Sequence, residues 1–287
     1  MYPANCDYHR ATSVDQALEL LGQHSDAKLL AGGHSLIPMM KLRLAHPAVL
    51  IDIGRIAELK GIAESNGGVR IGALTTHAEL AVSELLMERA QGLAEAAAKI
   101  GDPQVRNKGT IGGNIAHADP ASDLPAVLVA LGATVVLRGG SGERQVAAVD
   151  FFKGLLTTDM AADELLIAVE VAGLTAGSGS GYLKVEHPAS GYAVCGAAAV
   201  VTMEGGSCSA AGLAFNGIGA TPVDASGVAT GLVGTSADDA RIDAAVDENL
   251  SVDDPLGDVH ASGDYRVALA RAYGKRALKL ARDRALA

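Results

Sequence analysis

Two Gly-Gly pairs, each bordered by hydrogen-bonding side chains, carry the clearest chemistry in the sequence. The first glycine segment reads Ala31-Gly32-Gly33-His34-Ser35, and the second reads Thr110-Ile111-Gly112-Gly113-Asn114. Because glycine has no Cβ, consecutive backbone N–H groups can turn toward one point and a phosphate can approach them closely. Ser35, Thr110 and Asn114 add short side-chain donors. A single Gly-Gly pair is compatible with an ordinary turn, but two such loops together favour a pyrophosphate site.

The motifs of the common nucleotide-binding and hydrolytic folds are absent from the sequence. It contains no G-x-G-x-x-G fingerprint and no G-x-x-x-x-G-K-[ST] loop, so neither a Rossmann fold nor a P-loop is supported. No G-x-S-x-G elbow is present to activate a serine. We therefore expect a different dinucleotide-binding architecture and no catalytic acid, base or nucleophile on this chain.

Metal and iron–sulfur chemistry is not expected on this chain either. Cys6, Cys195 and Cys208 are far apart and lack C-x-x-C spacing, which argues against a disulfide framework, a zinc site or an iron–sulfur cluster built by this chain alone. His117 and Asp119 are spaced like two metal ligands on one strand face, but no third ligand follows them. We expect Cys195 to be a buried small residue.

Composition and charge indicate an acidic cytoplasmic protein rather than a nucleic-acid-binding or membrane protein. The formal net charge is −10, aromatic residues make up 3% and tryptophan is absent, so the chain offers neither a basic face nor stacking platforms for bases. The N-terminus lacks a signal-peptide pattern. The apolar run of residues 124–137 is shorter than the ~20 residues of a membrane span.

The elements that must hold the two glycine segments follow an α+β pattern. In residues 1–55, a capping-box pattern at Ser13 and Gln16 predicts a helix over 13–23, and strands at 28–31 and 49–53 flank the first segment. In residues 56–175, the patterns predict short strands at 69–71, 134–137 and 165–171, and helices at 76–89, 91–100 and 123–131.

A third unit is expected over residues 176–287, after a glycine-rich stretch at 173–181 that is typical of a linker. Its patterns predict strands at 193–203 and 207–215, helices at 223–231 and 238–246, a loop at 253–263 and a final amphipathic helix at 265–284. The many basic residues of the final helix indicate either a solvated face or a docking surface for an acidic partner subunit.

A series of motifs in fixed order resembles one protein family over essentially the whole chain. The motifs are Tyr8-His9-Arg10, the stretch from Leu30 through the first glycine segment to Arg43, Ile51-Asp52-Ile53, residues 71–77, residues 102–114, Asp119-Pro120 and residues 122–125. In this order they resemble the FAD-binding medium subunits of molybdenum hydroxylases, the xanthine dehydrogenase family, and among these the medium subunits of aerobic carbon monoxide dehydrogenases.

The resemblance implies a fold and a set of cofactor contacts. The implied fold is of the vanillyl-alcohol-oxidase (PCMH) type, in which two N-terminal subdomains, here 1–55 and 56–175, cradle FAD and a C-terminal domain of sheet and helices, here 176–287, closes over it. Both glycine segments are implied to hold the pyrophosphate. The other implied cofactor-binding residues are Asp123, Leu166 on the flavin or adenine side, Lys184 near the isoalloxazine and Tyr192 beside the ring.

The resemblance also implies a role in a larger complex. Electrons would pass from a molybdenum cofactor on a large subunit, through [2Fe-2S] clusters on a small subunit, to FAD on this chain and then to an external acceptor. A dimer of heterotrimers is implied, with peripheral association to membrane electron acceptors as an option. Oxidation of carbon monoxide is the preferred overall reaction, and hydroxylation of an N-heterocycle, aromatic acid or aldehyde is the alternative.

Several alternatives stay open at this point. The chain is also compatible with a non-catalytic nucleotide-binding scaffold subunit or a stand-alone flavin oxidase, and the acceptor is a quinone, oxygen or a nicotinamide. Read without the family, Asp123 is an N-cap, and His34 is either a structural histidine or a group that tunes the flavin. Relatives often carry an acidic residue directly before the tyrosine, where this chain has Gly191.

Overall fold

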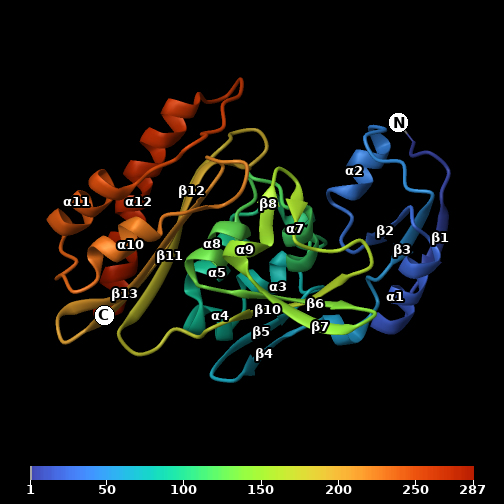
Figure 1. Ribbon diagram of the computed structural model, residues 1–287, viewed down its shortest axis with the longest axis horizontal. Coiled ribbons are helices and arrows are strands. Elements are labelled where there is room, and N and C mark those ends of the chain that lie inside the picture. Colours follow the sequence, from blue (N-terminus) through green and yellow to red (C-terminus); the bar gives the residue numbers. More distant parts are fainter. Residues whose placement is uncertain (1) are drawn as a thin grey trace.

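The computed structural model describes residues 2–287 and arranges them as three units along the long axis of the molecule (Figure 1). Each unit is built around its own sheet, with three strands in the N-terminal unit, five in the middle unit and four in the C-terminal unit. A two-stranded ribbon of β8 (Phe152–Gly154) and β9 (Thr157–Thr158) lies beside them. The mixture of helices and mostly antiparallel sheets confirms the predicted α+β class.

The N-terminal unit is a parallel sheet in the order β1 (Asp7–Arg10), β3 (Val49–Asp52) and β2 (Ala27–Leu30), with α1 (Val14–Gln23) connecting β1 to β2. The helix predicted over 13–23 is confirmed, because Ser13 caps it by accepting the N–H of Gln16 at 3.2 Å. The Gln16 side chain accepts the N–H of Thr12 instead of that of Ser13. The capping box is therefore only half formed.

The first glycine segment leads into a short helix, α2 (Leu36–Lys41), that the sequence patterns did not predict. Pro38 lies in its first turn. A backbone N–H at that place has no partner inside the helix, so proline costs no hydrogen bond there. Pro38 is therefore compatible with the helical conformation of α2.

The middle unit holds the antiparallel sheet. Its strands lie in the order β4 (Ile62–Ser65), β5 (Gly68–Gly72), β10 (Leu165–Val171), β6 (Thr134–Gly139) and β7 (Gly142–Ala147). Its helices are η1 (Ala57–Leu59), α3 (His77–Ala81), α4 (Glu84–Arg89), α5 (Gln91–Ala98), α6 (Pro103–Arg106), α7 (Ile111–His117), α8 (Leu124–Ala130) and α9 (Ala148–Phe151). The three strands and the helices predicted at 91–100 and 123–131 are confirmed.

The helix predicted over 76–89 is two helices. Thr76 and Glu79 form a complete capping box at the start of α3, and the Ser83 side chain caps α4 by accepting the N–H of Leu86. Each cap starts a new helix, so the apolar periodicity continues across the break while the backbone does not. An isolated β-bridge joins Thr76 to Thr110, which fixes the start of α3 beside the second glycine segment.

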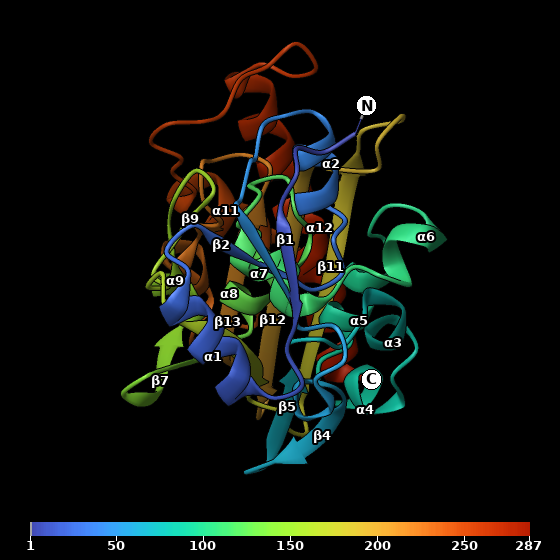
Figure 2. The same cartoon turned by 90° about the vertical axis from the view of Figure 1, so that its right-hand side faces the viewer.

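The C-terminal unit is an antiparallel sheet of β11 (Ser178–Glu186), β12 (Ala193–Glu204), β13 (Ser207–Asn216) and β14 (Val223–Asp224), followed by α10 (Ser226–Leu232), α11 (Asp239–Asn249) and α12 (Gly263–Leu286). Helix α12 packs on β11 and β12, and α5 and α8 of the middle unit also contact this sheet. Figure 2 shows the long strands β11 and β12 running behind the N-terminal unit. The predicted helix at 223–231 is wrong at its start, because residues 223–224 pair with β13.

The linker predicted over 173–181 is wrong in its second half. Residues 178–181 belong to β11, and Gly179 and Gly181 lie against α12. A Cβ on Gly179 would lie 2.2 Å from the carbonyl oxygen of Ala281, and one on Gly181 would lie 2.8 Å from the Leu280 side chain. These glycines are required by the close approach of a helix to a strand, and not by flexibility.

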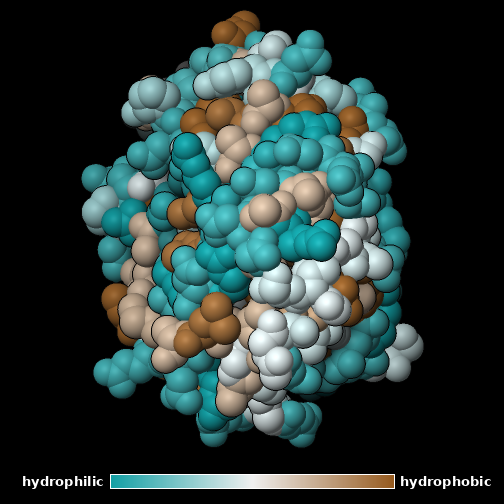
Figure 3. All heavy atoms as spheres, turned by 90° about the vertical axis from the view of Figure 1, so that its left-hand side faces the viewer, coloured by the Kyte–Doolittle hydropathy of each residue, from teal (hydrophilic) through white to brown (hydrophobic). Residues whose placement is uncertain are grey.

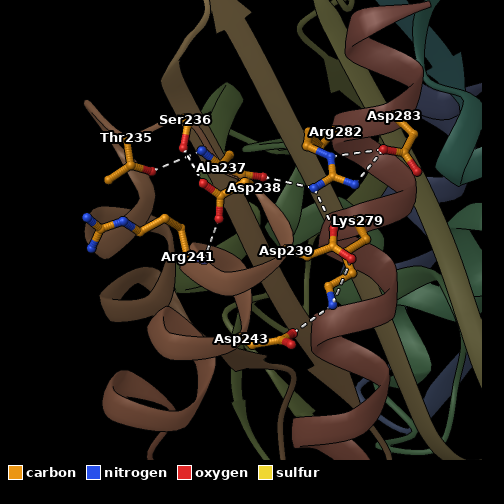
Figure 4. Close-up of polar contacts among 10 residues, drawn as sticks. All are labelled: Thr235, Ser236, Ala237, Asp238, Asp239, Arg241, Asp243, Lys279, Arg282 and Asp283. Atoms are coloured by element: carbon orange, nitrogen blue, oxygen red, sulfur yellow. Dashed lines mark hydrogen bonds and ion pairs between the residues drawn. The ribbon is translucent and has the colours of Figure 1, made fainter.

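The outer face of the C-terminal unit is mostly hydrophilic, with hydrophobic residues in small separate groups (Figure 3). On this side, Lys279 and Arg282 of α12 pair with acidic residues at the start of α11, Asp239 and Asp243 among them (Figure 4). Arg266 is buried and donates to backbone carbonyls. Arg266, Lys279 and Arg282 therefore hold α12 against other parts of its own chain. The sequence predicted either a solvated face or a docking surface for these residues, and not this arrangement.

A polar joint connects the middle and C-terminal units. Arg284 near the end of α12 pairs with Glu95 of α5 at 2.5 Å and donates to the Ser180 carbonyl at 2.6 Å. Glu95 also accepts the N–H of Tyr182, and the Ser180 hydroxyl accepts the N–H of Gly92. Three elements that are distant in sequence, α5, β11 and α12, are thus held at one place. Across residues 2–287, no helix is both long and apolar enough to cross a bilayer.

Candidate cofactor-binding site

The fold brings the two glycine segments into direct contact. The first segment follows β2, and the second forms the start of α7. A Cβ on Gly32 would lie only 2.1 Å from the carbonyl oxygen of Lys108, and one on Gly113 would lie 3.9 Å from the Ala31 Cβ. Gly32 must therefore be glycine for the N-terminal unit to reach the middle unit at this point.

The first glycine segment offers a row of free backbone donors. The N–H groups of Gly32, Gly33, His34 and Ser35 donate to no acceptor within the described chain, and the Ser35 side chain does not cap α2. Gly33 has a φ of +74°, which lets the chain turn sharply here. Four successive amides without an internal acceptor leave a row of donors available to an anion.

The amides of the second glycine segment are already bonded inside the protein. Those of Ile111 and Gly112 donate to carbonyls of the segment that follows β5, at 3.0 and 2.9 Å. Those of Gly113 and Asn114 donate to Thr110, the N-cap of α7. The loop predicted for residues 110–114 is therefore a helical turn, and its backbone donors are occupied.

What the second segment can offer a ligand is a small surface and one side chain. Gly113 is exposed and Asn114 is half-buried. The buried Ser122 hydroxyl donates to Oδ1 of Asn114 at 2.7 Å, which leaves the Nδ2 group of Asn114 as a donor. Ser122 was not among the predicted site residues, although it directly precedes one of them.

Asp123 occupies the N-cap position of α8, as the sequence suggested, but its side chain is a buried carboxylate that does not cap the helix. Its side chain accepts no hydrogen bond from the backbone of α8. It accepts the Tyr182 hydroxyl at 2.6 Å and the Lys184 ammonium at 3.1 Å. Burial raises the pKa of Asp123 to about 6, although Lys184 and Tyr182 both act to lower it. Tyr182 is fully buried, and its role was not predicted.

Lys184 is enclosed by acceptors from three segments. Its side chain is 1% exposed, and Nζ donates to the carbonyl of Lys99 at 2.7 Å, to that of Gly191 at 2.7 Å and to Asp123. An ammonium has three protons, so none is left for a cofactor. The structure thus places Lys184 as the group that holds the end of α5 and the hairpin of residues 187–192 together.

Tyr192 lies at the end of that hairpin and is 47% exposed. Partial burial raises the pKa of its hydroxyl, and the nearby carboxylates of Asp119 and Asp123 raise it further. Gly191 has a φ of +72°, in the region that disfavours most side chains but tolerates Asp and Asn. A Cβ there would meet Gly101 only at 3.7 Å, an ordinary contact. An aspartate at this position in relatives is therefore compatible with the same backbone.

The remaining predicted residues separate into different environments. Leu166 is buried in the core of the middle unit, opposite Leu137 in the sheet. Cys195 is fully buried, which confirms its interpretation as a small core residue, and burial raises the pKa of its thiol to about 12. His117 lies in the last turn of α7, so the shared strand face suggested for it and Asp119 is wrong. No group of metal-ligating side chains gathers anywhere in residues 2–287.

Comparison with known families matches both halves of the chain. Residues 4–172 match the model of the FAD binding domain in molybdopterin dehydrogenase, and residues 181–281 match that of the CO dehydrogenase flavoprotein C-terminal domain. These matches support the fold implied by the resemblance, with an FAD-binding part and a C-terminal flavoprotein domain.

Individual relatives are similar over their full length. The carbon monoxide dehydrogenase medium chain of Hydrogenophaga pseudoflava is 42% identical, with 98% of each chain covered, and the glyceraldehyde dehydrogenase medium chain of Sulfolobus acidocaldarius is 38% identical, with 97% of this chain and 99% of that one covered. A solved carbon monoxide dehydrogenase from H. pseudoflava superposes with a TM-score of 0.95 at 43% identity, covering 99% of both chains. The chain therefore belongs to the FAD-binding medium subunits of carbon monoxide dehydrogenase-like molybdenum hydroxylases.

Proposed function

We propose that this chain relays electrons through FAD bound at the glycine segments, receiving them from [2Fe-2S] clusters on a small partner subunit and passing them to an external acceptor. A molybdenum cofactor on a large partner subunit would supply the electrons. The observation that carries the proposal is the row of free N–H groups from Gly32 to Ser35, which lies against the start of α7. FAD would supply the electron-accepting chemistry when bound.

The residues at this place fit a pyrophosphate. Four successive amides without internal acceptors match a doubly charged group that needs many donors, and the Asn114 amide adds another from the facing segment. Neither segment carries a lysine or arginine, so the backbone does the binding. Leu166 is too deeply buried to contribute more than an apolar wall from inside the sheet.

The buried residues near Tyr192 would orient the flavin end of the site. Lys184 fixes the Gly191 carbonyl, and the Asp123 carboxylate balances the Lys184 charge. Tyr192 follows directly and presents a partly exposed ring. No acid–base pair is needed on a chain that only relays electrons, and Lys184 is engaged with the Asp123 carboxylate and the Gly191 carbonyl.

The overall reaction of the complex is proposed to be oxidation of carbon monoxide. Two carbon monoxide dehydrogenase medium chains are 42% and 40% identical to this chain. A second candidate is favoured almost equally, because the alpha subunit of the 6-hydroxypseudooxynicotine dehydrogenase complex is 38% identical over the full length. The proposal includes a cytoplasmic dimer of heterotrimers that meets a membrane acceptor peripherally.

Visible absorption of the purified chain, alone and with its partner subunits, tests the proposal. We expect the isolated chain to show the two absorption bands of oxidised flavin. Carbon monoxide should not bleach these bands in the isolated chain, and should bleach them once the partner subunits are added. Absence of the flavin bands would contradict the FAD site. Bleaching of the isolated chain by a substrate would indicate a stand-alone oxidase, and bleaching of the complex by an aldehyde or N-heterocycle but not by carbon monoxide would overturn the preferred substrate.

A further inference from the structure

His77 is a buried imidazole without a polar partner, close to the glycine segments. It is the first residue of α3 and is 3% exposed. Its Nδ1 atom is enclosed and has no hydrogen-bond partner, and no hydrogen bond to the ring is present within the described residues. An unpaired polar group in the interior destabilises a fold, so its retention calls for a partner from outside the chain.

The His77 ring lies beside Gly109, which in turn lies against Gly32 of the first segment. The backbone N–H of His77 donates to the Gly109 carbonyl at 3.0 Å, and a Cβ on Gly109 would lie 2.8 and 2.9 Å from Cδ2 and Nε2 of the ring. Gly109 and its neighbour Lys108 are also the residues that approach Gly32 within contact distance. Gly109 alone therefore separates the imidazole edge from Gly32 in space, and Thr110 is the next residue along the chain.

The charge state of the ring suits a hydrogen-bond donor. Burial, and then the nearby His34, lower the pKa of His77 to about 4. The ring is therefore neutral at physiological pH and carries one proton. Nδ1 is enclosed by protein, so Nε2, on the ring edge beside Gly109, is the nitrogen left for a ligand at the glycine segments. With the proton on Nε2, the group left unpaired inside is an acceptor, which a protein interior tolerates better than an unpaired donor.

We propose that His77 is a cofactor-binding residue whose Nε2–H donates to an oxygen of the FAD bound at the glycine segments. The inference rests on the proposed function and adds a side chain from α3 to a site otherwise formed by backbone amides. It also explains Gly109, because any side chain there would occupy the space of the imidazole edge. Gly109 would thus be a steric requirement of the histidine.

Variants of the full chain test this role through FAD affinity and the stability of the FAD-free protein. In H77L, we expect the dissociation constant for FAD to rise roughly 10- to 100-fold, because a hydrogen bond to the charged pyrophosphate of FAD is lost. The FAD-free H77L protein should be as stable as the wild type or more stable, since an unpaired buried polar group has been replaced by an apolar one. H77Q, which keeps an N–H donor, should recover most of the affinity.

The matched control is L80A, which removes a fully buried side chain from the same helix. It should lower the stability of the FAD-free chain while leaving the affinity of the folded protein close to wild type. Wild-type affinity in H77L, or a loss of stability in H77L comparable to that in L80A, would overturn the proposal and indicate a structural histidine. Failure of the wild-type chain itself to bind FAD would instead contradict the proposed function.

Discussion

Replacing Lys184 by methionine should destabilise the protein in a manner that depends on pH. The variant removes the cation that pairs with Asp123 and leaves the carbonyls of Lys99 and Gly191 without their donor. The Asp123 carboxylate keeps only the Tyr182 hydroxyl. Breaking a buried ion pair from one side costs about 3–5 kcal/mol, mostly because the other charge stays buried. Loss of the two hydrogen bonds to carbonyl oxygens, without the charge effect, would alone lower the free energy of unfolding by about 1–2 kcal/mol.

The pH dependence follows from the titration of Asp123. Burial raises its pKa in the folded protein to about 6, from the usual 3.8. The folded protein therefore holds this proton more tightly than the unfolded chain, so the stabilisation from protonation is complete below 3.8 and is lost as the pH rises through about 6. Without Lys184 the pKa of Asp123 rises further. At pH values above the new pKa, each additional pKa unit lowers the free energy of unfolding by about 1.4 kcal/mol.

Urea unfolding of wild type and K184M at about pH 5 and about pH 8 measures this effect. The difference in unfolding free energy should be about 1–2 kcal/mol at the lower pH, where Asp123 is protonated in the variant and mainly the two carbonyl bonds are lost, and larger at the higher pH. Adding D123N to K184M should restore part of the loss at the higher pH. The control is K279M, which breaks a partly exposed pair with Asp239 and Asp243 and should cost less than about 1 kcal/mol. A K184M effect equal to that of K279M, or equal at both pH values, would refute the reasoning.

Three further predictions concern other parts of the structure. G32A should abolish FAD binding, because its Cβ would lie 2.1 Å from the Lys108 carbonyl oxygen; G22A, with nothing within 4 Å, should bind FAD normally and thus serves as the control in the same titration. Cys195 should resist thiol reagents in the folded protein, because burial raises its pKa to about 12, whereas the half-buried Cys6 should react first in a mass-spectrometric labelling time course. R284M should lower the unfolding free energy by roughly 1–3 kcal/mol in urea titrations, because Glu95 and the Ser180 carbonyl lose their shared donor.

Local signals predicted much of the fold. The first helix was predictable because Ser13 and the apolar spacing lie within one stretch of chain, and the final helix was predictable from its long periodicity. The start of β11 was missed because its glycines look flexible in sequence. In the structure, Gly179 is required by its close contact with Ala281, about a hundred residues away in the chain. Nothing local distinguishes a glycine used for mobility from one used for close packing.

The same contrast holds for the site. The glycine segments could be singled out from the sequence because residue type and spacing alone suggest a phosphate-binding loop. Their different roles were not, because the amides of the second segment are occupied by carbonyls that only the folded chain brings near. The bonds from Asp123 to Tyr182 and Lys184 span 59 and 61 residues, so no sequence window contains them. His77 carried one local signal, the capping box of Thr76 and Glu79 that places it at a helix start.

Hydrogen–deuterium exchange of the FAD-free and FAD-loaded chain, resolved to single amides, tests most directly whether the first glycine segment is the phosphate cradle. We expect the N–H groups of Gly32, Gly33, His34 and Ser35 to exchange quickly without FAD and to become protected when FAD binds, because they have no internal acceptors. The amides of residues 111–114 should be protected in both states. Protection that appears on FAD binding at residues 111–114 and not at residues 32–35 would contradict the proposed site.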